Sequence, residues 1–280
     1  MSPVALITGT SSGIGLSSAV AAARHGFTTV ATLRDPSKDS ALRAAAESAG
    51  VELDVRRLDV VDGDSITSCI DSVVADHGAL DVLVNNAGRG FVGTIEQVSM
   101  EEMRDVMEGN FFGVVATTKA ALPHLRASGG RVVTVTSVGG VVGQPFNEAY
   151  CAAKFAVEGF MESLAPVAAT VGVRVSVIEP GPVTTEFVNN VGVDVGAMFA
   201  EGGGYTPAMQ AYFTHVMAEF ANPESAQTAD DVAETVLGAM VTDSAAFRHQ
   251  TSEWAKTFTG YKLSDHDGSA VVGMTTDWVK

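Results

Sequence analysis

The chain has 280 residues, of which 46% are hydrophobic, and its formal net charge at pH 7 is −16. This length and hydrophobic content can bury a substantial core, and no Pro/Gly/Ser-rich linker or run of like charges divides it, so we expect one domain over residues 1–280. The acidic balance leaves no broad basic face to neutralise phosphates, and no apolar run approaches the roughly 18 residues of a membrane span. We therefore expect neither a nucleic-acid partner nor a membrane span.

The cysteines and the first residues suggest the cellular compartment. Cys69 and Cys151 are the only cysteines, and neither belongs to a Cys-x-x-Cys pair. The chain enters a strand pattern almost at once, without the charged and then apolar regions of a secretory signal peptide. Both features predict a reduced, cytoplasmic protein.

Short β-branched runs alternate with helical patterns along most of the chain. Strands are predicted at residues 4–8, 28–33, 55–58, 81–85, 131–136 and 174–178, and helices at 13–25, 38–48, 64–77, 100–127 and 148–171. This alternation predicts parallel pairing through right-handed crossovers. The predicted fold class is α/β, with a Rossmann-type doubly wound parallel sheet flanked by helices. In such a sheet ligands bind beyond the carboxyl ends of the strands.

Local signals mark several helix ends. Ser99 and Glu102 form a capping box at the start of the fourth helix, and Gly26 and Gly78 stand where helices are expected to end.

The regular alternation weakens after Gly181. We expect residues 186–228 to be a substrate-covering insertion after the sixth strand. Thr228 and Asp231 open a further helix, so residues 229–280 are expected to hold a C-terminal helix, a last strand and a tail.

The segment Gly9-Thr-Ser11-Ser-Gly13-Ile-Gly15 fits two motifs at once. Gly-x-Ser-x-Gly is the nucleophile elbow of α/β-hydrolases, whereas the three glycines form a turn under a dinucleotide pyrophosphate. A hydrolase also needs an acid and a histidine that return to the serine, and no histidine here carries a neighbouring motif. A phosphate loop of the Walker type fails because no lysine follows the glycines. We therefore predict a dinucleotide site.

No metal site is predicted. The sequence contains no His-Glu-x-x-His motif, and we interpret Asp265-His266-Asp267 as a polar turn.

The end of the second strand predicts which dinucleotide binds. An NAD enzyme usually has Asp or Glu there to hold both ribose hydroxyls. Here Leu33 offers no carboxylate and Arg34 can pair with a 2′-phosphate, although Asp35 follows directly. These residues predict NADP(H).

At this point the sequence resembles the classical short-chain dehydrogenases/reductases, continuously from residue 4 to about 188. The matching motifs are Thr8-Gly9-x-x-x-Gly13-x-Gly15, Asn85-Asn86-Ala87-Gly88, Asp59, Asn110, Ser137, Tyr150-x-x-x-Lys154 and the 180–185 segment. The residues around Arg34, Ser137 and Tyr150 resemble the branch of 17β-hydroxysteroid and retinol dehydrogenases. The resemblance implies a homodimer or homotetramer, assembled through the helices that hold Asn110 and Tyr150.

The resemblance also implies residue roles. The implied catalytic residues are Asn110, Ser137, Tyr150 and Lys154. The implied cofactor-binding residues are Gly9, Ser11, Ser12, Gly13, Ile14, Gly15, Arg34, Asp59, Val60, Asn86, Ala87, Gly88, Tyr150, Lys154, Pro180, Gly181, Val183 and Thr185.

These residue types suit proton exchange with an alcohol or carbonyl oxygen. Tyr150 and Lys154 are four residues apart and share one helix face. A free tyrosine has a pKa near 10, and we expect the lysine ammonium and an oxidised nicotinamide to lower the pKa of Tyr150. Ser137 follows a strand and can orient the substrate oxygen. Asn110 lies between two glycines, where we expect a local helix irregularity and a side chain that holds a water for proton relay to Lys154.

The sequence therefore predicts an NADP(H)-dependent oxidoreductase that interconverts an alcohol and a ketone or aldehyde on a hydrophobic small molecule, such as a steroid or retinoid. One alternative is a non-catalytic NADP(H)-binding sensor or scaffold, and another is an epimerase or dehydratase on a related fold. Within the insertion, Tyr212 and His215 are candidate substrate contacts, and Met198, Met209 and Met217 form either a pliable lid or ordinary core.

Overall fold

A computed structural model describes residues 2–184, 195–244 and 246–269 of the chain. Its centre is a parallel sheet of seven strands in the order β3-β2-β1-β4-β5-β6-β9. The chain order reverses between β1 and β4, so the topological switch point lies there. The strands are β1 (Val4–Thr8), β2 (Thr28–Leu33), β3 (Asp54–Arg57), β4 (Val82–Asn85), β5 (Arg131–Val135), β6 (Arg174–Glu179) and β9 (Arg248–Gln250).

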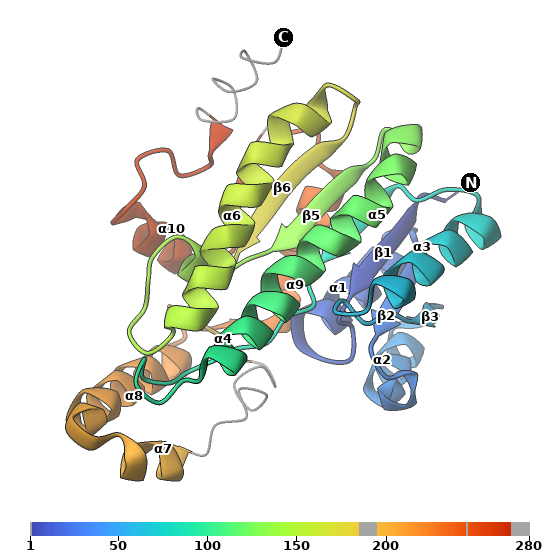
Figure 1. Cartoon of the computed structure of the whole chain (residues 1–280). Helices are drawn as coiled ribbons and strands as arrows, with labels where there is room; N and C mark the ends of the chain where they lie inside the picture. The colour runs from blue at the N-terminus through green and yellow to red at the C-terminus, as the bar shows by residue number, and fades with distance from the viewer. Residues whose placement is uncertain (1, 185–194, 245, 270–280) are drawn as a thin grey trace.

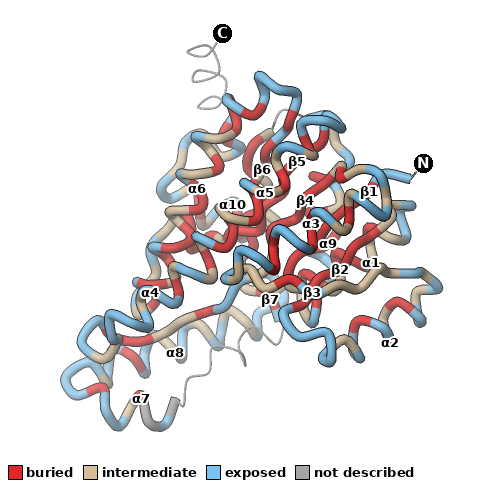
Figure 2. The backbone as a smooth tube through the Cα atoms, turned by 45° about the vertical axis from the view of Figure 1, so that its right-hand side comes forward, coloured by how far each residue is buried: buried red, intermediate tan, exposed pale blue. Residues whose placement is uncertain are grey.

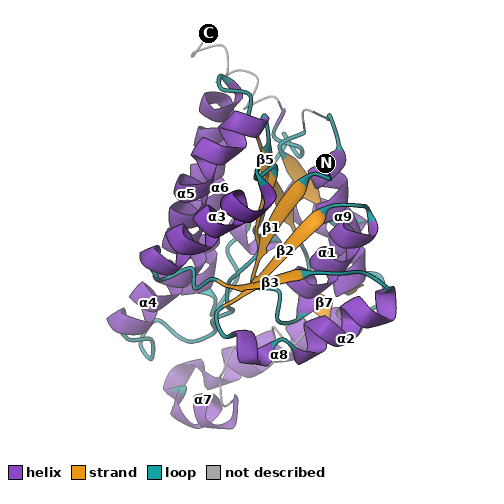
Figure 3. Cartoon of the chain, turned by 90° about the vertical axis from the view of Figure 1, so that its right-hand side faces the viewer, coloured by secondary structure: helices purple, strands orange, loops and turns teal. Residues whose placement is uncertain are grey.

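Helices cover both faces of the sheet (Figures 1 and 3). The predicted doubly wound α/β architecture is therefore confirmed. On one face lie α3 (Gly63–His77), α5 (Gly113–Ser128) and α6 (Glu148–Ala169). On the other face lie α1 (Gly13–Arg24), α2 (Ser40–Ala49) and α9 (Ala229–Val241).

The core divides into two clusters because side chains alternate along each strand. Leu6, Leu83 and Val132 face the cluster that contains residues of α3, α5 and α6. Ile7 and Val84, one residue further along their strands, face the cluster with α1 and α9 instead. Figure 2 shows buried residues running through the sheet, with exposed residues on the outer helix faces. Strands that are buried on both faces explain the continuous apolar runs in the sequence.

The predicted elements agree closely with the observed ones, except in the fourth helix. The structure divides it into α4 (Met100–Met107), a π-helical turn η2 (Glu108–Phe112) and α5. The π-helical turn contains Asn110, which confirms the expected irregularity. The capping box of Ser99 and Glu102 is also confirmed.

The segment after β6 reaches beyond the carboxyl ends of the strands. A two-stranded parallel sheet joins β7 (Val183–Thr184) to β8 (Gln227–Thr228), so both ends of the insertion are held together. Figure 1 shows α7 and α8 below the large sheet, and α10 close to α6. The elements of this region are α7 (Val195–Glu201), a 3-10 turn η5 (Gly203–Tyr205), α8 (Thr206–Ala221) and, after β9, α10 (Glu253–Gly260).

The length and polarity of the helices show whether any of them could span a membrane. Within the described residues, no helix is both long and apolar enough to cross a bilayer.

Candidate active site

One large cavity, of about 1940 Å³, opens at the carboxyl ends of the strands. It is bounded by the turn after β1, the ends of β2, β4, β5 and β6, the first turns of α6, and residues of α8 and α10. All but one of the site residues predicted from the sequence line this cavity; Thr185 is the exception, since it lies outside the described residues. Segments from the first strand to the last helix therefore meet at one place.

The glycines after β1 are required by close backbone packing. Gly9 has a φ of +71°, and a Cβ there would lie 2.8 Å from Cα of Ala87. A Cβ on Gly15 would lie 2.3 Å from the carbonyl oxygen of Gly9 and 2.4 Å from the amide nitrogen of Asn86. Asn86 Nδ2 donates to the carbonyl oxygens of Thr8 and Gly9, at 2.9 and 3.0 Å. The turn and the loop after β4 therefore form one close-packed unit.

The amino end of α1 begins at this turn. Its N-cap residue, Ser12, makes no side-chain capping bond in the described structure, and the first turn contains no acidic residue. The first backbone N–H groups of a helix have no partner within the helix, and together with the helix dipole they favour an anion. Ser11 is exposed beside them at the cavity wall. This end of the cavity can hold a phosphate group.

Two cationic side chains follow β2. Arg34 and Lys38 are both exposed and both line the cavity. The carboxylate of Asp35 accepts bonds from the hydroxyl and the backbone N–H of Ser37, at 2.7 and 3.1 Å, and these bonds lower the pKa of Asp35. Asp35 is thus engaged in capping the turn η1 (Pro36–Lys38). Sequence reasoning missed Lys38, whose only signal was its position four residues after Arg34.

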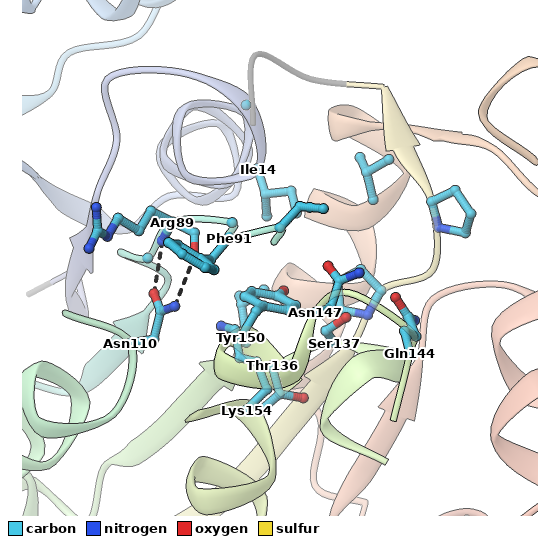
Figure 4. A pocket seen from close by; sticks show the side chains of 18 of the residues that line it. Ile14, Arg89, Phe91, Asn110, Thr136, Ser137, Gln144, Asn147, Tyr150 and Lys154 are labelled. Atoms are coloured by element: carbon cyan, nitrogen blue, oxygen red, sulfur yellow. Dashed lines mark hydrogen bonds between the residues drawn. The ribbon is translucent and has the colours of Figure 1, made fainter. Parts of the chain in front are cut away.

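Tyr150, Ser137 and Lys154 lie together in the cavity wall (Figure 4). Ser137 follows β5 and hydrogen-bonds the Tyr150 side chain, while its Oγ accepts from the backbone N–H of Gly139 at 2.9 Å. Lys154 Nζ donates to the carbonyl oxygen of Val135 at 3.0 Å and lies 5.8 Å from the centre of the Tyr150 ring. One turn of α6 therefore brings the phenol and the ammonium to the end of β5.

The pKa values of this pair differ from the sequence expectation. Burial raises the pKa of Tyr150 to about 12, and the hydrogen bond with Ser137 offsets this only in part. Burial lowers the pKa of Lys154 to about 8, against the opposing charge of Glu158. The expectation combined the Lys154 ammonium with an oxidised nicotinamide; in the protein without the cofactor the pKa of Tyr150 is raised instead, because desolvation of the phenolate dominates.

Asn110 is fully buried in the π-helical turn and fastens the loop that follows β4. Its Oδ1 accepts from the backbone N–H of Arg89 at 2.8 Å, and its Nδ2 donates to the Arg89 carbonyl oxygen at 2.8 Å (Figure 4). A Cβ on Gly88 would lie 2.9 Å from Asn110 Oδ1 and 3.8 Å from Lys154 Nζ. The sequence did not anticipate this fastening, whereas the water-holding role of Asn110 stays a prediction.

The rest of the cavity is largely aromatic. Trp254 and Phe258 of α10 stack with ring centres 5.0 Å apart and planes 8° apart. Gly181 leaves room for this stack, since a Cβ there would lie 2.9 Å from the Trp254 ring. Sequence reasoning missed Trp254 and Phe258, because their place beside Gly181 depends on how α10 folds back. Other rings in the lining belong to Phe91, Phe199, Tyr212, Phe213 and Phe220.

A polar contact joins the insertion to the start of α6. Asn147 Nδ2 donates to the hydroxyl of Tyr212 at 2.6 Å, and the rings of Phe146 and Tyr212 lie edge to face at 5.5 Å. His215, the other candidate substrate contact of the insertion, also lines the cavity. The insertion therefore forms part of the same wall as the first turn of α6.

The three methionines of the insertion separate into two kinds. Met217 lines the cavity and is half-exposed. Met198 and Met209 are buried and are not among the residues that form the cavity wall. The lid interpretation therefore applies at most to Met217, and the core interpretation holds for Met198 and Met209.

The cavity fits a nicotinamide dinucleotide better than a metal centre. The glycine turn, the start of α1 with its free N–H groups and the cations after β2 line the same cavity as Tyr150, which suits a dinucleotide with phosphate groups. Among the residues described, no group of three or more His, Cys, Asp or Glu side chains is arranged to hold a metal ion.

Several known proteins are similar to this chain in sequence. Residues 3–195 match the family model described as short chain dehydrogenase. Human retinol dehydrogenase 8 is 38% identical over 278 residues, covering 96% of this chain and 88% of the relative. Human 17-beta-hydroxysteroid dehydrogenase type 1 is 37% identical over 277 residues, covering 96% and 83%.

Solved structures agree with the sequence relatives. A variant of actinorhodin polyketide ketoreductase with NADPH has a TM-score of 0.75 and 29% identity, covering 90% of this chain and 96% of that one. A short chain dehydrogenase from Mycobacterium paratuberculosis bound to NAD has a TM-score of 0.77 and 27% identity, covering 92% and 98%. Both nicotinamide dinucleotides therefore occur among proteins with this fold.

Proposed function

This chain belongs to the short-chain dehydrogenase family, in the branch of retinol dehydrogenase 8 and 17-beta-hydroxysteroid dehydrogenase type 1. From that premise we propose that it is an NADP(H)-dependent oxidoreductase that interconverts an alcohol and a ketone or aldehyde on a hydrophobic substrate such as a steroid or retinoid. The observation that supports the proposal most is a single cavity shared by the glycine turn and by Ser137, Tyr150 and Lys154. The glycine turn and each of the three side chains occur in many proteins without this function. Their presence together in one cavity favours hydride transfer.

In the proposed mechanism Tyr150 exchanges a proton with the substrate oxygen. Ser137 hydrogen-bonds the same oxygen and holds it toward the phenol, since it already bonds Tyr150. The glycine turn and Lys154 would hold a nicotinamide dinucleotide, whose chemistry when bound would be hydride transfer at the substrate carbon. In the reducing direction the substrate oxygen must gain a proton, and Tyr150 donates it as a phenol. In the oxidising direction the substrate hydroxyl must lose a proton, and Tyr150 accepts it as a phenolate.

Lys154 has an electrostatic role in this mechanism. Because burial raises the pKa of Tyr150 to about 12, a phenolate needs positive charge nearby. The Lys154 ammonium lies on the same helix face and is anchored to Val135, which keeps its charge beside the ring. Asn110 holds the Gly88 loop against the same wall, so that the loop, the ammonium and the phenol keep one geometry.

The proposed preference for NADP(H) rests on the charges after β2. Arg34 and Lys38 present two cations to the cavity, whereas Asp35 uses its Oδ1 oxygen to accept both bonds from Ser37. A 2′-phosphate is recognised by such cations through charge-assisted bonds, whereas NAD offers them only a neutral 2′-hydroxyl.

The proposed substrate class follows from the aromatic wall. Aromatic rings of α8 and α10 line the cavity that contains Tyr150, and Asn147, Tyr212 and His215 add polar groups to the lining. A flat apolar molecule with a polar group at one end suits a wall of this kind.

The proposed assembly is a homodimer or homotetramer in the cytoplasm. Phe112, in the π-helical turn that carries Asn110, and Val167, in α6 with Tyr150, are 50% and 53% exposed and supply apolar surface for self-association. Cys69 and Cys151 are buried free thiols, as suits a reducing compartment.

The test is turnover by the purified protein with hydroxysteroids, retinoids and simple ketones, followed by the nicotinamide absorbance with NADPH and with NADH. We expect turnover of at least one hydrophobic substrate and a preference for NADPH. Tight NADPH binding without turnover of any substrate would favour the non-catalytic sensor instead. Preference for NADH would contradict the argument from Arg34 and Lys38.

A further inference from the structure

A buried cluster of charged residues lies directly behind the candidate active site. Glu158 of α6, Glu179 at the end of β6 and Arg248 at the start of β9 have side chains that are only 6%, 0% and 8% exposed. Arg248 Nε lies 3.1 Å from Glu179 Oε1 and 3.4 Å from Glu158 Oε2. Glu162, one turn further along α6, accepts from Arg248 Nη2 at 2.5 Å. None of these residues touches the cavity.

The cluster holds more carboxyl groups than cations. Three carboxyl groups face the guanidinium of Arg248, and the nearest further cation on the packed elements described is Lys154, one helical turn before Glu158. Glu162 is 28% exposed and can be ionised in contact with water, but ionised Glu158 and Glu179 would place two buried negative charges against one guanidinium. Burying an uncompensated charge is costly, so the cluster keeps at least one proton.

Other polar groups near the cluster do not supply the missing positive charge. Gln250, next but one to Arg248 on β9, is neutral and donates to Glu179 Oε2 at 2.7 Å. His249 lies between them and by strand alternation points to the opposite face. Asp267, whose carbonyl oxygen accepts from the backbone N–H of Arg248, uses its carboxylate on Ser269.

The geometry assigns the proton to Glu158. Thr136 Oγ1 lies 2.5 Å from Glu158 Oε1 and 2.9 Å from the carbonyl oxygen of Ile178. A hydroxyl has one hydrogen, and the carbonyl can only accept. Both short contacts are favourable together only if Thr136 donates to the carbonyl and a protonated Glu158 donates to Thr136. Glu179 has no such need, because Gln250 donates to it.

Glu158 is also connected to the reacting groups. Tyr150, Lys154 and Glu158 follow one another at single-turn intervals on α6. Thr136, the partner of Glu158, directly precedes Ser137, and Lys154 is bonded to the residue before Thr136. A change at Glu158 can therefore reach both the serine and the lysine.

We propose that Glu158 is a positioning residue of this oxidoreductase: its carboxyl holds a proton near neutral pH, anchors Thr136 beside Ser137, and gains a negative charge next to Lys154 as the pH rises. The inference rests on the function proposed above. That charge stabilises the ammonium of Lys154, so the enzyme keeps its charged lysine to a higher pH than it otherwise would.

The first arm of the test needs no turnover. Burial raises the pKa of Glu158 from the ordinary 4.5 to about 8, with the charge of Glu179 adding to the effect. A carboxyl with a raised folded-state pKa contributes stability that is full below the unfolded value and is lost as the pH rises through the folded one. The wild-type unfolding temperature should therefore fall relative to that of Glu158→Gln between about pH 5 and pH 9.

The second arm measures kcat/KM against pH for wild type, Glu158→Gln and the control Glu162→Gln. Glutamine reproduces the donor of a protonated Glu158, so we expect rates within about twofold of wild type near neutral pH. On the alkaline side, kcat/KM of Glu158→Gln should begin to fall about one pH unit lower than that of wild type. The reason is that the variant lacks the negative charge of Glu158, which stabilises the Lys154 ammonium one helical turn away. Glu162→Gln removes a carboxylate that pairs with the same Arg248 guanidinium, but Glu162 lies one helical turn further from Lys154. This control should therefore leave the pH of the alkaline fall in kcat/KM unchanged.

Several results would overturn the inference. In the kinetic arm, they are an alkaline fall of kcat/KM at the same pH in Glu158→Gln as in wild type, or an equal shift of that fall in Glu162→Gln. In the stability arm, they are a Glu158→Gln protein that fails to fold, or one whose unfolding temperature does not rise relative to wild type as the pH rises. Wild-type protein without any turnover would refute the proposed function, and the inference would fall with it. A turning-over wild type with no unfolding difference would refute the inference alone.

Discussion

Substitution of Gly15 by alanine is the sharpest perturbation of the cofactor turn. The new Cβ would stand 2.3 Å from the Gly9 carbonyl oxygen and 2.4 Å from the amide nitrogen of Asn86, whereas ordinary contacts begin near 3.4 Å. The Gly9 oxygen belongs to the backbone, and the Asn86 side chain is held by two hydrogen bonds to the carbonyl oxygens of Thr8 and Gly9. Relief therefore requires α1 to move away from the sheet or Asn86 to release both bonds.

The expected cost follows from these two routes. Forcing an extra carbon into a close-packed site costs about 1–3 kcal/mol, and two neutral hydrogen bonds contribute about 0.5–1.5 kcal/mol each. The helix preference of alanine over glycine returns up to about 1 kcal/mol. Either route costs about 2 kcal/mol in mid-range, so we expect Gly15→Ala to lose about 1–2 kcal/mol of unfolding free energy, and to bind NADPH at least about tenfold more weakly because the phosphate cradle is displaced.

The assay combines denaturant unfolding with a titration of NADPH. The matched control is Gly238→Ala in α9, where nothing lies within 4 Å of the added carbon. That control should be neutral or more stable by up to about 1 kcal/mol, with unchanged NADPH affinity. Wild-type stability and affinity in Gly15→Ala would refute the close-packing argument, as would equal losses in both variants.

Three further variants test single residues. Tyr150→Phe should lower kcat by about 10²–10⁴-fold with NADPH affinity unchanged, and comparable turnover would eliminate the phenol as acid and base. Arg34→Ala should raise the KM for NADPH at least about tenfold and leave that for NADH unchanged, because one charge-assisted bond is worth about 1.5–3 kcal/mol; equal effects on both cofactors would contradict the 2′-phosphate role. Asn110→Ala should lower the unfolding free energy by about 1–3 kcal/mol in denaturant titration, since two bonds to the main chain of Arg89 are lost, and an unchanged value would show that the π-helical turn holds the loop without them.

Local patterns were sufficient for most of the secondary structure. Strands buried on both faces leave long β-branched runs, and caps such as Ser99 with Glu102 depend on neighbouring residues only. The π-helical turn at Asn110 was indicated by its two flanking glycines, but the division into two helices was not, because a single extra residue per turn barely changes the apolar spacing.

The candidate site divides in the same way. Gly9, Gly15 and the Tyr150–Lys154 pair are recognisable in sequence, because each depends on a turn or on one helix face. The stack of Trp254 and Phe258 beside Gly181 was invisible, since it depends on where α10 returns to the sheet.

The sequence by itself determined the alternating order of strands and helices, the glycine turn and the identity of the groups that can move a proton, because these depend on short-range spacing and on side-chain chemistry. Only the tertiary structure decided what surrounds those groups. Burial in the cavity wall raises the pKa of Tyr150 where the sequence led us to expect a lowering. Packing of β6 and β9 against α6 likewise brings three carboxyl groups to one guanidinium behind Lys154. Desolvation and long-range charge pairing depend on which segments meet in space, and no local pattern of residues records them.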